Sequence, residues 1–178
     1  MHRPLLFLDV DGTVLPTGGV SLPETLEGWY ATWQHASNPQ LAAIDRSHGR
    51  RLLSLGCEVV WATAWMHDVN TVIAPILGLP ALPVAEMGEL PGLDDPLWAD
   101  DDDAAALSWK TRHPCRIAAG RPFVWIDDEL TAADRTWVSA NHSGSALLHR
   151  VDSQTGLQGG DLDVVETWLR TLNEDELS

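Results

Sequence analysis

The residues with the clearest chemical potential lie where an apolar run ends, in LLFLDVDGTV at positions 5 to 14. Asp9 and Asp11 flank a single valine there, and Gly12 and Thr13 follow them. Two carboxylates this close repel each other when they are withdrawn from water, so a positive charge has to balance them. A strand that finishes in this way therefore indicates a cation site.

Polar groups also follow two other apolar runs. Thr63 comes after VVWA, Asp127 and Asp128 come after FVWI, and Lys110 lies between these runs in SWKTRH. Each group alone has an ordinary explanation, because an Asp after a strand commonly forms a turn or cap, a Thr satisfies its hydroxyl in the core, and a Lys lies on the surface. Their occurrence together, in this order, favours a shared site.

Four carboxylates at one site require a divalent cation between them. Hard oxygen ligands without a nearby His or Cys favour magnesium over zinc, so we expect Mg²⁺. A hydroxyl from Thr63 and a point charge from Lys110, added to bound magnesium, form a receptor for a dianionic phosphate. The residues thus predict a magnesium site that handles phosphate.

Short apolar runs alternate with segments of helical periodicity along the chain. The predicted strands are Leu5–Val10, Glu58–Thr63, Leu82–Glu86, Phe123–Ile126 and Ala146–Val151. The predicted helices are Gln40–Leu55, Asp68–Leu77, Ala132–Ala140 and Leu162–Leu172, and the SWKTRH segment could open another. We expect Pro75 to kink or end the second of these helices and Asp161 to cap the last.

This alternation predicts an α/β fold, a Rossmann-like three-layer sandwich in which helices cover both faces of a central parallel sheet. In such sheets ligands bind beyond the carboxyl ends of the strands, where the polar groups of this chain lie. No internal repeat or low-complexity linker divides the sequence, so we expect one domain over residues 1–178.

The ordered set of motifs resembles that of the haloacid-dehalogenase-like (HAD) phosphohydrolases over residues 5 to 130. DVDGT at 9 to 13 is similar to the first HAD motif, Asp-x-Asp-x-Thr. Thr63 resembles the second motif, Lys110 the third and Asp127-Asp128 the acidic fourth. The segments WATAWMHDVNTVIAPILGLP and RPFVWIDDEL are also similar to HAD domains associated with bacterial Swiss-army-knife RNA-repair proteins.

The resemblance implies a two-step reaction with magnesium. Asp9 would attack the phosphorus and form an aspartyl-phosphate, and Asp11 would protonate the leaving oxygen and then take a proton from water. The implied catalytic residues are Asp9, Asp11, Thr63 and Lys110. The implied metal site comprises Asp9, Asp11 through its backbone carbonyl, Asp127 and Asp128, with Asp128 favoured for direct contact and Asp127 for a water on the metal or for Lys110. The implied substrate-binding residues are Gly12, Thr13, Thr63, Ala64 and Lys110.

HAD enzymes often carry an inserted cap, but this chain has little room for one. The segment 14–39 and the Pro-, Gly- and Asp-rich segment Met87–Ser108 are both short, so we expect a capless enzyme in which residues 14–39 form at most a flap or minimal cap. An open site admits a bulky substrate or a second subunit, as in a homo-oligomer. Trp29, Tyr30 and Trp33 in the first insertion either pack on the core or stack on a base or sugar ring.

The formal net charge of −15 favours a small phosphorylated metabolite or nucleotide, because an acidic surface repels the nucleic-acid backbone. The RNA-repair resemblance instead suggests phosphate removal from nucleic-acid ends. Two further functions stay open. A signalling receiver is disfavoured because Lys110 precedes Asp127-Asp128, and a HAD fold that binds without catalysis is disfavoured because Asp9 and Asp11 are both present.

The remaining features suggest no other chemistry. No apolar run has the length of a membrane span or of a secretory signal, so we expect a cytoplasmic protein without membrane contact. Cys57 and Cys115 are expected to be reduced thiols. The run Asp100–Asp103 is expected to be a solvated loop or the start of a helix.

Overall fold

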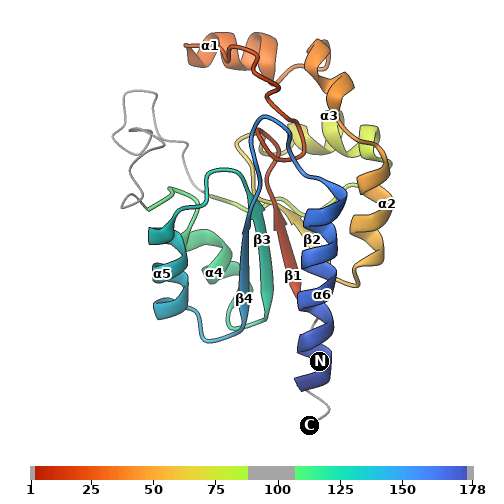
Figure 1. Ribbon diagram of the computed structural model, residues 1–178. Coiled ribbons are helices and arrows are strands. Elements are labelled where there is room, and N and C mark those ends of the chain that lie inside the picture. The colour runs from red at the N-terminus through yellow and green to blue at the C-terminus, as the bar shows by residue number, and fades with distance from the viewer. Residues whose placement is uncertain (1–2, 88–106, 176–178) are drawn as a thin grey trace.

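A computed structural model describes residues 3–87 and 107–175 of the chain (Figure 1). Its centre is a parallel sheet of four strands in the order β2-β1-β3-β4, with bounds β1 Leu5–Leu8, β2 Glu58–Trp61, β3 Phe123–Asp127 and β4 Ala146–Arg150. The first strand in the sequence thus lies between the second and the third. The predicted α/β fold with a central parallel sheet is confirmed.

Helices cover both faces of the sheet (Figure 1). On one face lie α2 (Ser47–Ser54), α3 (Asp68–Leu77) and α6 (Gly159–Asp175), and on the other lie α4 (Arg112–Ala118) and α5 (Ala132–Asn141). Side chains of a strand alternate between faces, so Leu6 and Leu8 join the first core cluster and Leu5 and Phe7 the second. All four are buried, which explains why β1 reads as an uninterrupted apolar run.

One predicted strand is wrong. Leu82–Glu86 makes only an isolated parallel bridge, between Val84 and Trp61 of the edge strand β2. The Trp61 N–H donates to the Pro83 carbonyl at 2.9 Å, and the Ala85 N–H donates to the Trp61 carbonyl at 2.7 Å. Pro83 has no N–H of its own, so this segment lies against β2 without extending the ladder.

The predicted helices form with some changes at their ends. α3 has the predicted bounds and continues past Pro75 to end at Gly78, whose left-handed φ of 67° suits a glycine. The predicted helix Gln40–Leu55 divides into a 3₁₀ turn, η2 (Pro39–Ala43), and α2. α6 starts before Asp161, so this residue lies in the first turn, where its carboxylate accepts the Gln158 N–H at 2.7 Å.

The segment 14–39 contains only two short helical pieces, α1 (Leu26–Gly28) and a π-helical turn, η1 (Trp29–Trp33). Both lie beyond the carboxyl end of the sheet (Figure 1). Most of the second insertion, Met87–Ser108, and the acidic run Asp100–Asp103 lie outside the described residues. The single domain over 1–178 and the minimal cap therefore stay predictions. Within the described residues, no helix has the length and apolar character of a membrane span.

Candidate active site

The carboxyl ends of three adjacent strands bring the predicted motifs together. Leu8 of β1 is paired with Trp61 of β2 on one side and with Ile126 of β3 on the other. Asp9 follows Leu8, and because its N–H donates to the Ile126 carbonyl at 3.1 Å, it lies level with Asp127, the last residue of β3. Thr63 comes two residues after the end of β2. Asp9, Thr63 and the Asp127-Asp128 pair consequently meet at one edge of the sheet.

Lys110 completes this group from the loop before α4. Its Nζ lies 2.8 Å from Asp9 Oδ1 and 2.9 Å from Asp127 Oδ2, and all three side chains are buried. Asp134, in the first turn of α5, holds the loop in place by accepting hydrogen bonds from the Ser108 N–H at 2.9 Å and from the Thr111 hydroxyl. The loop that carries Lys110, the third motif, is therefore held by Asp134, which also takes part in the capping box at the start of α5.

Asp127 and Asp128 have different environments. Asp127 Oδ2 accepts hydrogen bonds from Lys110 Nζ at 2.9 Å and from the Trp125 indole N–H at 3.2 Å. Its Oδ1 accepts the Glu129 N–H at 2.9 Å. Within the described residues, the Asp128 carboxylate accepts one long side-chain hydrogen bond, 3.5 Å from the Thr13 hydroxyl. Asp128 thus has more free coordination capacity than Asp127.

The electrostatics of the site reflect an excess of negative charge. Burial raises the pKa of Asp9 well above its ordinary range, and Lys110 only partly opposes this shift. Burial and the neighbouring Asp127 raise the pKa of Asp128 to about 8. Burial works against the charge of Lys110 too, but the attraction of Asp127 and Asp9 outweighs it and raises the lysine pKa.

Asp11 is held in a way that its sequence position did not reveal. Its Oδ1 accepts the indole N–H of Trp33 at 2.7 Å and that of Trp65 at 2.8 Å. Burial raises the pKa of Asp11, and the hydrogen bonds from Trp65 and Trp33 moderate that shift. Both tryptophans belong to the core, which is one of the two alternatives left open for Trp33, but they also bind the second carboxylate of the first motif.

The acidic cluster fits a metal ion. Asp9, Asp127 and Asp128 each offer a carboxylate oxygen within 4.8 Å of the others. The set is made of hard oxygen donors, and Lys110 alone cannot balance it, since the pKa of Asp128 stays raised. Oxygen donors with excess charge suit Mg²⁺. This buried cluster could therefore bind a metal ion.

Comparison with known proteins gives a family match that is consistent with the acidic cluster. The model of the family described as the HAD domain in Swiss Army Knife RNA repair proteins matches residues 5–162. The chain belongs to this HAD family. No curated protein and no solved structure matches it. The HAD fold and the Asp9, Asp127 and Asp128 cluster together indicate a phosphohydrolase with an acidic site that could hold a metal.

The predicted phosphate-binding residues of this HAD domain lie around the cluster. Thr63 is fully buried and its hydroxyl accepts the Trp65 N–H at 3.3 Å. Among the described residues its own hydrogen has no acceptor, so it is available to a ligand. Ala64 is half-buried beside it, and the Thr13 hydroxyl lies 3.4 Å from Asp9 Oδ2. These placements are compatible with the predicted roles, which stay predictions.

Gly12 has a reason to be glycine at this position. Its φ is +69°, and a Cβ there would lie 2.1 Å from Asp128 Oδ2. The turn of the first motif therefore packs directly against the carboxylate of the fourth. The turn is supported by the loop after β4, where the Leu157 N–H donates to the Thr13 carbonyl at 2.8 Å. No sequence motif marks this hydrogen bond between the two loops, so it was not predicted from the sequence.

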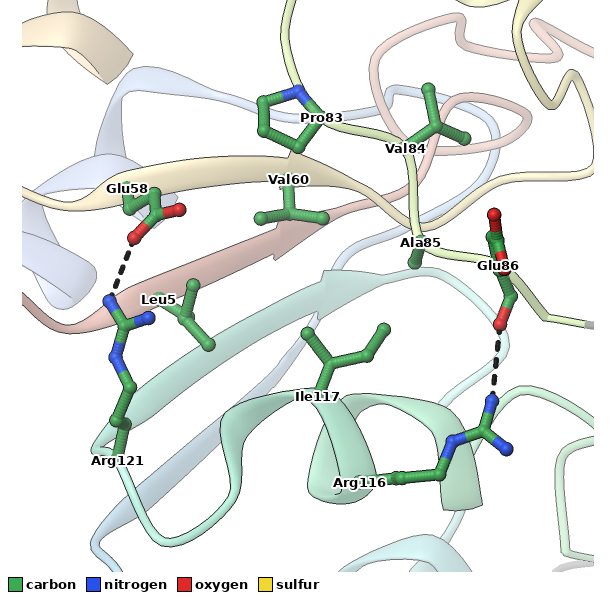
Figure 2. A pocket seen from close by; sticks show the side chains of 10 residues that line it. All are labelled: Leu5, Glu58, Val60, Pro83, Val84, Ala85, Glu86, Arg116, Ile117 and Arg121. Carbon is green, nitrogen blue, oxygen red and sulfur yellow. Dashed lines mark hydrogen bonds and ion pairs between the residues drawn. The ribbon is translucent and has the colours of Figure 1, made fainter.

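A hollow of about 400 Å³ lies elsewhere, between β2, the segment 83–86 and α4 (Figure 2). Its two arginines are engaged at either end of an apolar surface that includes Ile117 (Figure 2). Arg121 contacts Glu58 at 2.8 Å, and Arg116 donates to the Glu86 carbonyl at 3.4 Å. None of the described residues that line it belongs to the acidic cluster. The hollow is therefore separate from the acidic cluster at the carboxyl ends of the strands, which stays the candidate active site of the HAD domain.

Proposed function

We propose that this HAD domain is a Mg²⁺-dependent phosphomonoesterase that acts through an aspartyl-phosphate on a small phosphorylated metabolite or nucleotide. The observation that carries the proposal is the buried contact of Lys110 with Asp9 and Asp127, beside the less engaged carboxylate of Asp128. A carboxylate held in place by a lysine next to a potential cation site is poised for attack on a phosphate ester.

In the first step a carboxylate oxygen of Asp9 forms a bond to phosphorus while the bond to the leaving oxygen breaks. Asp11 gives its proton to that oxygen. In the second step Asp11 accepts a proton from water, which attacks the phosphorus and releases phosphate and Asp9. Thr63 and Lys110 donate to the phosphoryl oxygens in both steps, where charge develops.

The residues that would hold magnesium are Asp9, Asp128 and the backbone carbonyl of Asp11, with Asp127 holding Lys110. The bound ion supplies positive charge that screens the carboxylates from each other and from the phosphate. Asp128 is the better direct ligand because both oxygens of Asp127 already accept hydrogen bonds from protein groups.

A phosphatase screen with and without magnesium tests this function. It includes sugar phosphates, nucleoside monophosphates and a chromogenic aryl phosphate. We expect Asp9→Asn to abolish turnover and Asp68→Asn, at an exposed acid on α3, to leave it unchanged. Acid-quenched wild type should carry a phosphoryl group that Asp9→Asn lacks. Unchanged turnover in Asp9→Asn would exclude its role, and no turnover by wild type would favour a binding protein.

A second candidate is a phosphatase of nucleic-acid ends, which the name of the matching family favours. The same screen therefore includes oligonucleotides with a 3′- or 5′-phosphate. A higher kcat/KM on these oligonucleotides than on any small ester would support the second candidate over the first.

A further inference from the structure

Two indole groups converge on one oxygen of Asp11. Trp33 reaches it from η1, in the insertion after the first motif, and Trp65 reaches it from the segment after β2. Both indoles are nearly inaccessible to solvent, with exposed fractions of 4% and 1%. Water competes little for these hydrogen bonds, so the two N–H groups hold the Asp11 carboxyl group firmly.

An indole N–H can only donate a hydrogen bond. Asp11 Oδ1 accepts two such bonds, at 2.7 and 2.8 Å, which engage the two lone pairs of that oxygen. A proton on Oδ1 would need one of the same positions. A protonated Asp11 in this arrangement therefore carries its hydrogen on Oδ2.

We propose that Trp33 and Trp65 are positioning residues that confine the acidic proton of Asp11 to Oδ2 and direct it at the leaving oxygen. This inference rests on the proposed phosphomonoesterase function. In the step concerned, the bond from Asp9 to phosphorus forms, the bond from phosphorus to the leaving oxygen breaks, and the Oδ2 proton passes to that oxygen. The substrates that depend on it are alkyl phosphates, whose leaving group departs poorly without a proton.

If Trp33 and Trp65 served core packing alone, their loss would not affect alkyl phosphates more than other esters. Both tryptophans belong to the main core cluster, and a phenylalanine at either position keeps most of the ring packing while removing the N–H. Trp33→Phe and Trp65→Phe therefore separate the hydrogen bond from the packing. A loss that is specific to one class of leaving group identifies a defect in proton donation.

The test measures kcat/KM for glycerol phosphate and for p-nitrophenyl phosphate, whose anionic leaving group needs no proton. This parameter reports on steps up to the first irreversible one, in which the leaving group departs. We expect each variant to lose on the order of 10-fold with the alkyl ester and less than about 2-fold with the aryl ester. Asp11→Asn should show the same selectivity more strongly, and adding Trp33→Phe to it should cost nothing further.

Matched controls remove other indole N–H groups. Trp29→Phe changes a neighbour on η1 whose N–H lies 2.9 Å from the Gln34 amide, and Trp61→Phe changes a buried indole that donates to Asn70 at 3.2 Å. Neither should alter the ratio between the two esters. Thermal unfolding verifies that each variant folds, and if Trp65→Phe does not, Trp33→Phe on the short insertion decides.

Equal losses on both esters, or no loss on either, would overturn the inference while leaving the phosphatase intact. A shifted ratio in the control variants would overturn it as well. Failure of the wild type to hydrolyse either ester, or any phosphate in the wider screen, would instead contradict the proposed function on which it rests.

Discussion

Asp127 and Asp128 are adjacent in the sequence, yet their carboxyl groups have different surroundings. Asp127 is fully engaged by Lys110, Trp125 and the Glu129 N–H, whereas in the described part of the chain Asp128 accepts one long side-chain hydrogen bond, from Thr13. Without a cation, the ionised form of Asp128 is unfavourable in the folded chain, which raises its pKa to about 8. Occupation of the metal site should reverse this effect.

Removing the charge of Asp128 should thus have opposite effects with and without magnesium. Its pKa rises from 3.8 to about 8 on folding, so metal-free wild type loses stability as the pH rises between these values. We expect Asp128→Asn in EDTA to increase the free energy of unfolding at pH 7 by about 1–3 kcal/mol. In magnesium the wild type should gain more stability than the variant.

Urea unfolding in EDTA and in magnesium measures both effects. Asp127→Asn is the matched control, because it leaves Lys110 without one of its buried partners and should destabilise in both conditions. Equal destabilisation by Asp128→Asn with and without magnesium would contradict a metal role for this carboxylate.

Gly12→Ala should disable the site through a steric contact. The added Cβ would lie 2.1 Å from Asp128 Oδ2, at a φ of +69°. We expect a loss of stability of about 1–2 kcal/mol from the backbone strain and a loss of kcat/KM of at least about 10-fold, since small misplacements in an active site have large effects. Half-maximal activity should also require more magnesium.

Gly19→Ala is a matched control for the strain alone. Gly19 has a φ of +77°, but a Cβ there would have no neighbour within 4 Å. It should lose similar stability and keep the magnesium requirement of the wild type. If both variants lost activity equally, displacement of Asp128 would not be the cause.

The sequence allowed the acidic residues of the site to be predicted, because each follows a buried strand. It did not allow the hydrogen bonds of Asp11 with Trp33 and Trp65 to be predicted. These three residues are brought together by the fold, and a tryptophan in an apolar segment is equally typical of ordinary packing. The difference between Asp127 and Asp128 was expected only from the family resemblance, because the residues themselves do not show which of the two the distant Lys110 contacts.

At the scale of the elements, the strands with continuous apolar runs were predictable and the edge segment was not. β1 and β3 are buried on both faces, so their sequence alone identifies them. Leu82–Glu86 has a similar composition, but it lies beside the edge strand β2 and contains a proline. Pro83 argues against a full ladder strand, but proline is also tolerated in edge strands, so local composition alone does not decide whether such a segment joins the ladder.

Helix α2 gives an element-scale prediction through His48, which is buried against the core. Burial lowers the pKa of His48, Asp45 opposes this shift, Arg51 adds to it, and Asp161 opposes it weakly. The unfolded chain therefore binds a proton at higher pH than the folded one, and stability is lost as the pH falls below about 6.5. One such proton contributes at most about 1.4 kcal/mol per pH unit.

His48→Gln should flatten this part of the stability profile, while His67→Gln, at an exposed position before α3, should not. Urea unfolding between pH 7.5 and 5.5 gives the comparison, and only the difference between wild type and variant is assigned to His48. A difference that is the same at all pH values would show that its titration does not affect folding.

At the scale of the whole molecule, the net charge of −15 argues against the nucleic-acid substrate that the name of the matching family suggests. Basic residues that could attract a polyanion are partly neutralised, since Arg51 lies 2.6 Å from Asp163 and Arg121 lies 2.8 Å from Glu58. A small dianion needs only the local charge of Lys110 and a metal. A long nucleic acid must also approach the acidic surface.

The response to salt separates these two substrate classes. Proteins that attract nucleic acid by basic patches lose affinity steeply as salt rises, whereas screening should help a polyanion to approach an acidic protein. At constant magnesium, we expect an increase from about 50 to about 200 mM NaCl to raise kcat/KM for a phosphorylated oligonucleotide and to change that for a sugar phosphate by less than about 2-fold. A steep fall with the oligonucleotide would reveal a basic path to the site and would favour a nucleic-acid end as the substrate.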